Sequence, residues 1–322
     1  MSASHERKLA LLGGRTLAYE QAGNTSSPIV VLYLHGAFTI GEASKPSSVI
    51  LSKGVHYVAP TLPGWGNTSS PLPSTSYVDC ILSDMTVLLN HLYPEGSRNI
   101  TLYVAGGSYG TAPAQILYGA PYEKFPYGRR IAGLLLLGAI SPFYYHRDYA
   151  KHMSWGNYIM AGPPARYVPF NLVARLVKLA LAKRLSTVEG AEKFLQDTVF
   201  GKMGEAERKE FAQWRDAQRL EEGETERKMA RNVMRSVATS WDGLLLMPQA
   251  DWGFRPGGLD EEHSRPPILI TSSKDDQMSP EGFAKYLVAN YKNARMKSVG
   301  GGHLSILYHL DEVWTEFLAV VP

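Results

Sequence analysis

Short apolar runs separated by turns rich in glycine and proline fill the first part of the chain. The runs at residues 29–34 (IVVLYL), 100–105 (ITLYVA) and 131–140 (IAGLLLLGAI) are apolar without alternation. Such runs are typical of strands that are buried on both faces of a sheet. Residues 77–93 instead carry apolar side chains at helical spacing, which predicts an amphipathic helix. Strands that alternate with helices in this order indicate an α/β fold with a mostly parallel sheet.

The pattern changes after Ser141 and Pro142. From residue 143 to residue 247 no buried strand is evident, and the apolar residues follow helical spacing over residues 169–185, 187–200, 205–220 and 224–241. Strand-like sequence returns at residues 266–276, and helix-like sequence follows it. We therefore predict an α/β core formed by residues 1–142 and 248–322, with a helical cap inserted at residues 143–247.

One predicted cap helix, residues 170–185, is both basic and amphipathic. Val173, Leu176, Val177, Ala180 and Leu181 share one face, opposite Arg175, Lys178 and Lys183. Such a helix can lie on a membrane surface. It can also pack its apolar face inward as part of the cap, and we favour this second interpretation.

Composition excludes several classes of function. The chain has 322 residues and a formal net charge of +3. This charge is too low to indicate a nucleic-acid-binding surface, which needs clustered Lys and Arg.

The N-terminus lacks the apolar core of a signal peptide. The longest apolar run has about ten residues, and a membrane span needs about twenty. With a single cysteine, Cys80, no intrachain disulfide can form. We expect a soluble cytoplasmic protein without stable membrane insertion; the sequence does not indicate an oligomeric state.

A Gly-x-Ser-x-Gly motif carries the strongest chemical signal. Ser108 lies in GGSYG, after the apolar strand at residues 100–105 and before a helix-like segment. This is the setting of a nucleophile elbow, in which a strained strand-to-helix turn exposes a serine and requires small neighbours. Gly106 and Gly110 meet that requirement. A plain glycine-rich turn is the alternative interpretation.

A serine nucleophile needs a base and an acid that orients the base. Of nine histidines, His303 has the most suitable setting, because it follows a late strand-like run and precedes the last helix. His35 precedes the nucleophile in an HG turn and fits a structural role better. Asp275 and Asp276 lie at the end of the strand-like residues 266–276. The order Ser, Asp, His is one of the known orders of a catalytic triad.

Taken together, these motifs resemble the α/β-hydrolase superfamily, in its cap-bearing branch, over nearly the whole chain. The matching stretches, in order, are LHGA (34–37), PTLPGWGNTSSP (60–71), GGSYG (106–110), SSKDDQMSP (272–280) and GGGH (300–303). The resemblance implies an α/β-hydrolase fold with an inserted helical cap. Members of the family usually carry the acid four residues before a proline, which favours Asp276 over Asp275.

The resemblance also implies a serine hydrolase mechanism. Ser108 would attack a carbonyl carbon, His303 would take its proton, and Asp276 would orient the imidazole. The backbone N–H groups of Ala37 and Tyr109 would form the oxyanion hole.

The substrate is predicted less directly. Phe38 immediately follows the predicted oxyanion loop, and Trp65 lies in the loop after the next predicted strand. Aromatic residues are also frequent in the predicted cap. We therefore expect a small, largely apolar or aromatic substrate, an ester or a thioester, contacted by a set of candidate binding residues: Phe38, Trp65, Tyr144, Trp155 and Trp252.

Other functions remain open at this point. The same triad could hydrolyse a carbon–carbon bond, transfer an acyl group or cleave a peptide. HGAFT at residues 35–39 differs from the HGGPG of proline iminopeptidases, which argues against aminopeptidase activity. A receptor without catalytic activity could share the fold. We expect no cofactor and no metal, because the sequence has neither a phosphate-binding loop nor a nucleotide-binding fingerprint.

Overall fold

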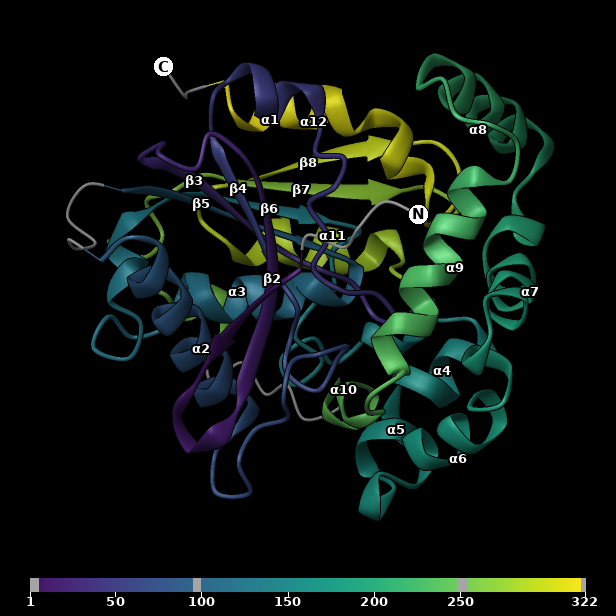
Figure 1. The fold of residues 1–322 in the computed structure, drawn as a ribbon, viewed down its shortest axis with the longest axis horizontal. Coiled ribbons are helices and arrows are strands. Elements are labelled where there is room, and N and C mark those ends of the chain that lie inside the picture. The colour runs from purple at the N-terminus through teal and green to yellow at the C-terminus, as the bar shows by residue number, and fades with distance from the viewer. Residues whose placement is uncertain (1–5, 95–99, 248–253, 320–322) are drawn as a thin grey trace.

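The computed structural model describes residues 6–94, 100–247 and 254–319. Within them the chain forms an eight-stranded sheet flanked by helices on both faces (Figure 1). The spatial order of the strands is β1-β2-β4-β3-β5-β6-β7-β8. Their bounds are β1 Arg7–Ala10, β2 Thr16–Gly23, β3 Ile29–Leu34, β4 His56–Pro60, β5 Thr101–Gly107, β6 Ile131–Leu137, β7 Ile268–Ser273 and β8 Ala294–Val299.

The strand pairing is mostly parallel, which confirms the predicted fold class. β3 through β8 pair in parallel, whereas β1 and β2 form an antiparallel pair and β2 runs antiparallel to β4. β3 and β5 lie in the centre of the sheet, and residues such as Val31 and Leu32 are fully buried although they point to opposite faces. This burial explains why their sequences are apolar without alternation.

Helices cover the two faces of the sheet. α1 (Ser48–Ser52) and α12 (Leu310–Phe317) lie on one face, and α2 (Tyr77–Leu92), α3 (Thr111–Gly119) and α11 (Glu281–Asn290) lie on the other (Figure 1). α2 begins where the Ser76 hydroxyl accepts a hydrogen bond from the Asp79 N–H, a common N-terminal cap. Each face of the sheet has its own apolar core, one of which centres on Trp314 and Phe317.

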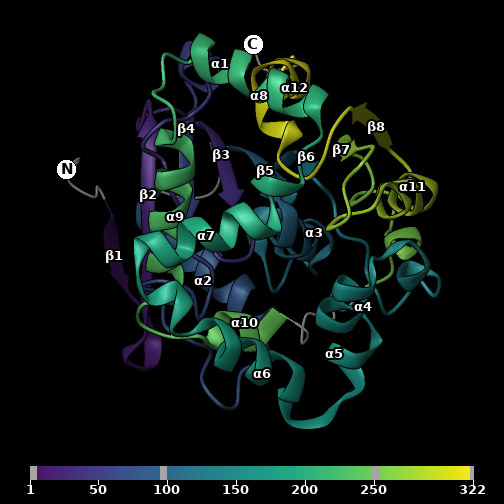
Figure 2. The ribbon, with the colours of Figure 1, turned by 90° about the vertical axis from the view of Figure 1, so that its right-hand side faces the viewer.

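Between β6 and β7 the described residues form helices and no strand. These helices lie beside the carboxyl ends of the parallel strands (Figures 1 and 2). Their bounds are α4 Trp155–Ala161, α5 Pro163–Tyr167, α6 Leu172–Leu181, α7 Val188–Thr198, α8 Glu205–Ala217, α9 Glu224–Val237 and α10 Asp242–Leu246. The helical character predicted for residues 143–247 is present, and its division from the core as a separate domain stays a prediction.

The inward packing predicted for the basic amphipathic helix is only partly correct. α6 turns Ala174, Val177 and Leu181 toward the rest of the cap, but Leu176 and Ala180, which we expected on the inner face, are exposed. The helix is apolar around more of its circumference than one packed face requires. Apolar spacing alone therefore did not identify which stripe is buried.

Candidate active site

Ser108 lies directly after β5, on a sharp turn into α3. Its φ is 50°, in the left-handed region that non-glycine residues rarely adopt. The chain turns here through one 3-10 turn, Ser108–Gly110, before α3 begins at Thr111. A strained residue held by a buried strand and a buried helix is the geometry of a nucleophile elbow.

The two glycines of the motif are required by close backbone contacts. A Cβ on Gly106 would lie 2.3 Å from the carbonyl oxygen of Gly110, and a Cβ on Gly110 would lie 2.0 Å from that of Leu34. No side chain fits at such distances. The elbow thus packs against β3 as well as against α3, and this fixes where Ser108 points.

The structure brings Ser108, His303 and Asp276 into one hydrogen-bonded chain. The Ser108 hydroxyl lies 3.0 Å from His303 Nε2, and His303 Nδ1 lies 2.7 Å from Asp276 Oδ2. These residues follow β5, β8 and β7, and parallel strands end at the same edge of the sheet. The network fits the tautomer in which Nδ1 donates to Asp276 and Nε2 accepts from Ser108.

Asp276 is held as an anion with a fixed orientation. Its Oδ1 accepts hydrogen bonds from the backbone N–H groups of Met278 (2.8 Å) and Ser279 (2.9 Å). Burial alone would raise the pKa of this carboxyl, but the charge of His303 and these hydrogen bonds together lower it below its usual value. The neighbouring Asp275 is exposed, so the structure brings to His303 the aspartate that the sequence favoured.

Opposing effects act on the pKa of His303. Burial lowers the pKa, because an imidazolium is disfavoured away from water, whereas the charge of Asp276 and its hydrogen bond raise it. The net result is a pKa above the usual value for histidine. His303 is therefore a stronger base than a free imidazole.

The HG loop lies against the serine. A Cβ on Gly36 would lie 3.3 Å from Ser108 Cβ, so the loop that carries Ala37 passes beside the nucleophile. His35 has the structural role expected of it, since its Nδ1 donates to Gly36 O and its Nε2 accepts from the Leu62 N–H. Burial lowers the pKa of His35 to about 4, so it stays neutral. The oxyanion role of the Ala37 and Tyr109 N–H groups remains a prediction.

Two of the candidate substrate residues form an aromatic cluster beside this loop. The centroid of the Phe38 ring lies 5.6 Å from that of Trp65, 5.7 Å from that of Phe194 and 6.2 Å from that of Trp241. The predicted core and the predicted cap therefore meet at Phe38. Trp65 is only 1% exposed and packs against Gly243 of α10. Trp65 therefore joins the cap to the core and leaves no surface for a ligand, contrary to the expectation. Phe38 is only partly buried and keeps its candidate role.

The remaining candidates do not join the cluster. Tyr144 is 60% exposed and packs on Tyr145, and Trp155 is 76% exposed and stacks on Tyr158. Both side chains are largely exposed to solvent, and their role in substrate binding stays a prediction. Aromatic composition did not distinguish cap residues that point inward from those that point outward. Trp252 lies outside the described residues.

Two contacts that sequence reasoning missed hold the histidine loop. The Ser305 hydroxyl donates to Ser273 Oγ at 2.8 Å and joins this loop to the strand before Asp276. From the cap, the buried Glu207 of α8 lies against Gly301 and Gly302 and accepts a hydrogen bond from the Gly302 N–H. Burial and the nearby carboxylates raise the pKa of Glu207. No local pattern predicts such a contact, because it joins segments about a hundred residues apart.

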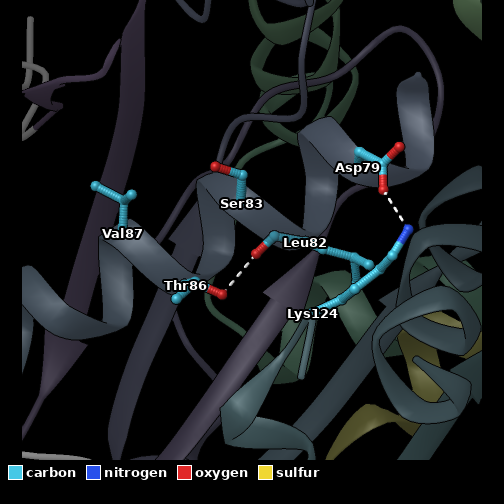
Figure 3. Close-up of a pocket in the computed structure, with 6 residues that line it drawn as sticks. All are labelled: Asp79, Leu82, Ser83, Thr86, Val87 and Lys124. Atoms are coloured by element: carbon cyan, nitrogen blue, oxygen red, sulfur yellow. Dashed lines mark hydrogen bonds and ion pairs between the residues drawn. The ribbon is translucent and has the colours of Figure 1, made fainter. Parts of the chain in front are cut away.

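A separate surface pocket has no part in this arrangement. It is an open pocket of about 290 Å³ beside α2, lined by Asp79, Leu82, Ser83, Thr86, Val87 and Lys124 (Figure 3). An ion pair of 2.9 Å between Lys124 and Asp79 crosses it. None of its lining residues belongs to the hydrogen-bonded chain of Ser108, so we do not assign the chemistry to it.

The described part of the chain contains neither a group of side chains suited to bind a metal ion nor a helix suited to cross a membrane. Within residues 6–94, 100–247 and 254–319, no group of three or more His, Cys, Asp or Glu side chains could hold a metal ion. In the same ranges, no helix combines the length and the apolarity that crossing a bilayer demands.

Comparison with known proteins places this geometry in context. A family model described as alpha/beta hydrolase family matches residues 31–319. Similar solved structures include a bromoperoxidase from Bacillus anthracis (16% identity, TM-score 0.62, 98% of this chain and 99% of that one). A second is a thermophilic esterase from Thermogutta terrifontis (16% identity, TM-score 0.59, 99% of both chains covered). A third is a hydrolase from Pseudomonas aeruginosa PA01 (17% identity, TM-score 0.60, 98% of both chains covered). No curated protein sequence matches the chain.

Proposed function

Because the chain belongs to the alpha/beta hydrolase family, we propose that it is a serine hydrolase that cleaves esters or thioesters of small, largely apolar acids. The observation that carries the proposal is the continuous chain of hydrogen bonds from Ser108 through His303 to Asp276. Esterases among the similar structures support the same reaction class. The identity to these structures is low, so the site residues of this chain carry the argument.

The reaction proceeds in two halves. Ser108 Oγ attacks the carbonyl carbon while His303 Nε2 takes its proton, and Asp276 stabilises the resulting imidazolium. The tetrahedral intermediate collapses to an acyl-enzyme, and His303 returns the proton to the departing alcohol or thiol. Water then attacks the acyl-enzyme with His303 again as the base, and this step releases the acid and restores Ser108.

Backbone N–H groups would stabilise the negative charge of each intermediate. Tyr109 follows the nucleophile within the 3-10 turn that precedes α3, and Ala37 follows Gly36, which lies beside Ser108. Donors fixed in the backbone need no rearrangement during the reaction, and one such donor contributes about 3 kcal/mol to lowering the barrier.

The acyl group would lie near Phe38. This ring is adjacent to the proposed oxyanion loop and packs among Trp65, Phe194 and Trp241. An apolar wall at this place favours short aliphatic or aromatic acyl groups over charged ones.

A substrate panel tests the proposed reaction class. We expect p-nitrophenyl acetate and butyrate and a butyryl thioester to be hydrolysed, with an initial burst of product if deacylation limits the rate. Amino-acid amides serve as the comparison for aminopeptidase activity. Turnover of the amides without turnover of the esters and thioesters would overturn the proposal.

The pH profile depends on His303, which must be neutral to act as the base. Since its pKa lies above 6.5, protonation already removes the base at mildly acidic pH. We expect kcat/KM to fall with decreasing pH along a single-proton limb whose midpoint lies above 6.5. Measurement of p-nitrophenyl butyrate hydrolysis from acidic to neutral pH checks this, and a midpoint well below 6.5 would contradict the assigned environment of His303.

Glu207 is expected to act as a positioning residue. Glu207→Ala removes the acceptor for the Gly302 N–H and should lower kcat about tenfold with little change in KM, because small displacements of a catalytic group slow the reaction. Glu207→Gln keeps an acceptor oxygen and should restore most of the rate. Steady-state kinetics of the two variants separate positioning from general damage, since equal losses in both would contradict this role.

A further inference from the structure

The outer side of α6 and the turn before it present an apolar surface to solvent. Its members are Tyr167, Phe170, Leu172, Leu176 and Leu179, all exposed, and we call this set the outer α6 face. Leu172, Leu176 and Leu179 are four and three residues apart and so form one stripe along the helix. α6 lies at the outer end of the cap, away from the sheet (Figures 1 and 2).

This exposure is not needed for packing within the cap. The opposite side of α6 already provides Ala174, Val177 and Leu181 for that purpose. Phe170 is 86% exposed and has a φ of 59°, and Asn171 follows it with a φ of 54°. A bulky side chain held in the left-handed region and in solvent is unusual on both counts. Contiguous exposed apolar surface of this kind marks an interaction site.

The charge around the outer α6 face favours one kind of partner. From residue 149 to residue 187 the sequence contains no Asp or Glu. Arg175 and Lys178 are exposed on α6, and Lys183 is exposed just after its end. Two copies of the chain that met through this face would bring these cations together, which disfavours self-association. A surface of anionic lipid headgroups over an apolar interior complements both the cations and the leucines.

We propose that the outer α6 face docks the protein on anionic lipid bilayers, with α6 lying in the interface and its leucines below the headgroups. The docked end of the cap is connected to the acid loop, because the Asn157 side chain of α4 donates to Gln277 O, next to Asp276. The docking itself does not depend on the proposed hydrolase activity.

Vesicle flotation with the full chain tests the docking. The probes are phosphatidylcholine vesicles with and without about 30% phosphatidylglycerol, at about 0.1 M and 0.5 M salt. We expect binding to the anionic vesicles that weakens at high salt, and little binding to phosphatidylcholine alone. Absence of binding to the anionic vesicles at low salt would overturn the proposal.

Matched variants locate the contact. The double variant Leu176→Glu/Leu179→Glu should bind at least tenfold more weakly, and Lys178→Glu about fivefold or more, since one cation near an anionic surface contributes about that factor. Leu12→Glu and Lys209→Glu replace exposed residues of the same types on other elements and should bind like the unmodified protein. Equal binding by all variants would overturn the assignment to α6.

Two further measurements distinguish lost docking from lost folding and from self-association. Thermal unfolding and hydrolysis of a soluble p-nitrophenyl ester should be unchanged in the α6 variants, so a defect in docking is separable from a defect in folding or catalysis. If sedimentation velocity instead shows a dimer that Leu176→Glu/Leu179→Glu disrupts, and no vesicle binding occurs, the face mediates self-association and the lipid proposal is wrong.

Discussion

Replacement of Ser108 by alanine should reduce kcat by about 10⁴ to 10⁶, with little change in KM. The loss is large because covalent catalysis disappears entirely, and only binding and the backbone donors remain to accelerate attack by water. The Ser108 side chain is small and only partly buried, so the alanine should leave the fold intact. Initial-rate measurements with p-nitrophenyl butyrate check the prediction.

Ser141 provides the matched control. Its hydroxyl is buried and hydrogen-bonded to a histidine, His146 Nδ1, at 2.8 Å, and the His146 ring stacks on Tyr286 of α11. The histidine hydrogen-bonded to Ser108 is instead His303. Ser141→Ala should retain activity within a few-fold, after correction for any loss of folded protein. A Ser108→Ala variant that keeps a tenth or more of the activity would contradict the assignment of the nucleophile.

Replacement of Asp276 by asparagine should reduce kcat by about 10⁴. The N–H groups of Met278 and Ser279 hold the Oδ1 position, so the amide oxygen of the asparagine would occupy it. The amide NH₂ would then face His303 and favour the tautomer with its proton on Nε2. A protonated Nε2 cannot accept the Ser108 proton, although the fold is preserved.

The adjacent aspartate is the control for this variant. Asp275 is exposed, and its backbone N–H, which donates to Gly301 O, survives a change of side chain. Asp275→Asn should therefore be nearly as active as the unmodified enzyme. Comparison of the two variants by kcat decides which aspartate orients His303, and a larger loss in Asp275→Asn would contradict the assignment.

Local sequence signals predicted the centre of the fold and the three residues of the hydrogen-bonded chain. β3, β5 and β6 are apolar because both of their faces are buried. This pattern is visible in the sequence of each strand by itself, without knowledge of its tertiary contacts. Ser108 was recognisable because the turn requires glycines at fixed positions, and Asp276 and His303 because each follows a late strand in the order of a triad.

Features that depend on tertiary contacts were not predictable. β1 is short, largely exposed and at the sheet edge, so it has no apolar signature. Glu207 contacts the histidine loop only because α8 packs beside that loop. Trp155 is 76% exposed, and its aromatic side chain alone did not predict this exposure. In α6, a helix with two apolar sides, spacing could not reveal which side is buried.

Covalent labelling of the nucleophile tests the central claim most directly. The protein is treated with a fluorophosphonate probe, and the modified peptide is located by mass spectrometry in the unmodified chain, Ser108→Ala and Ser141→Ala. Stoichiometric labelling at Ser108, absent in Ser108→Ala and retained in Ser141→Ala, is the predicted result. An unlabelled chain, or a label on a different serine that persists in Ser108→Ala, would contradict a Ser108-dependent hydrolase.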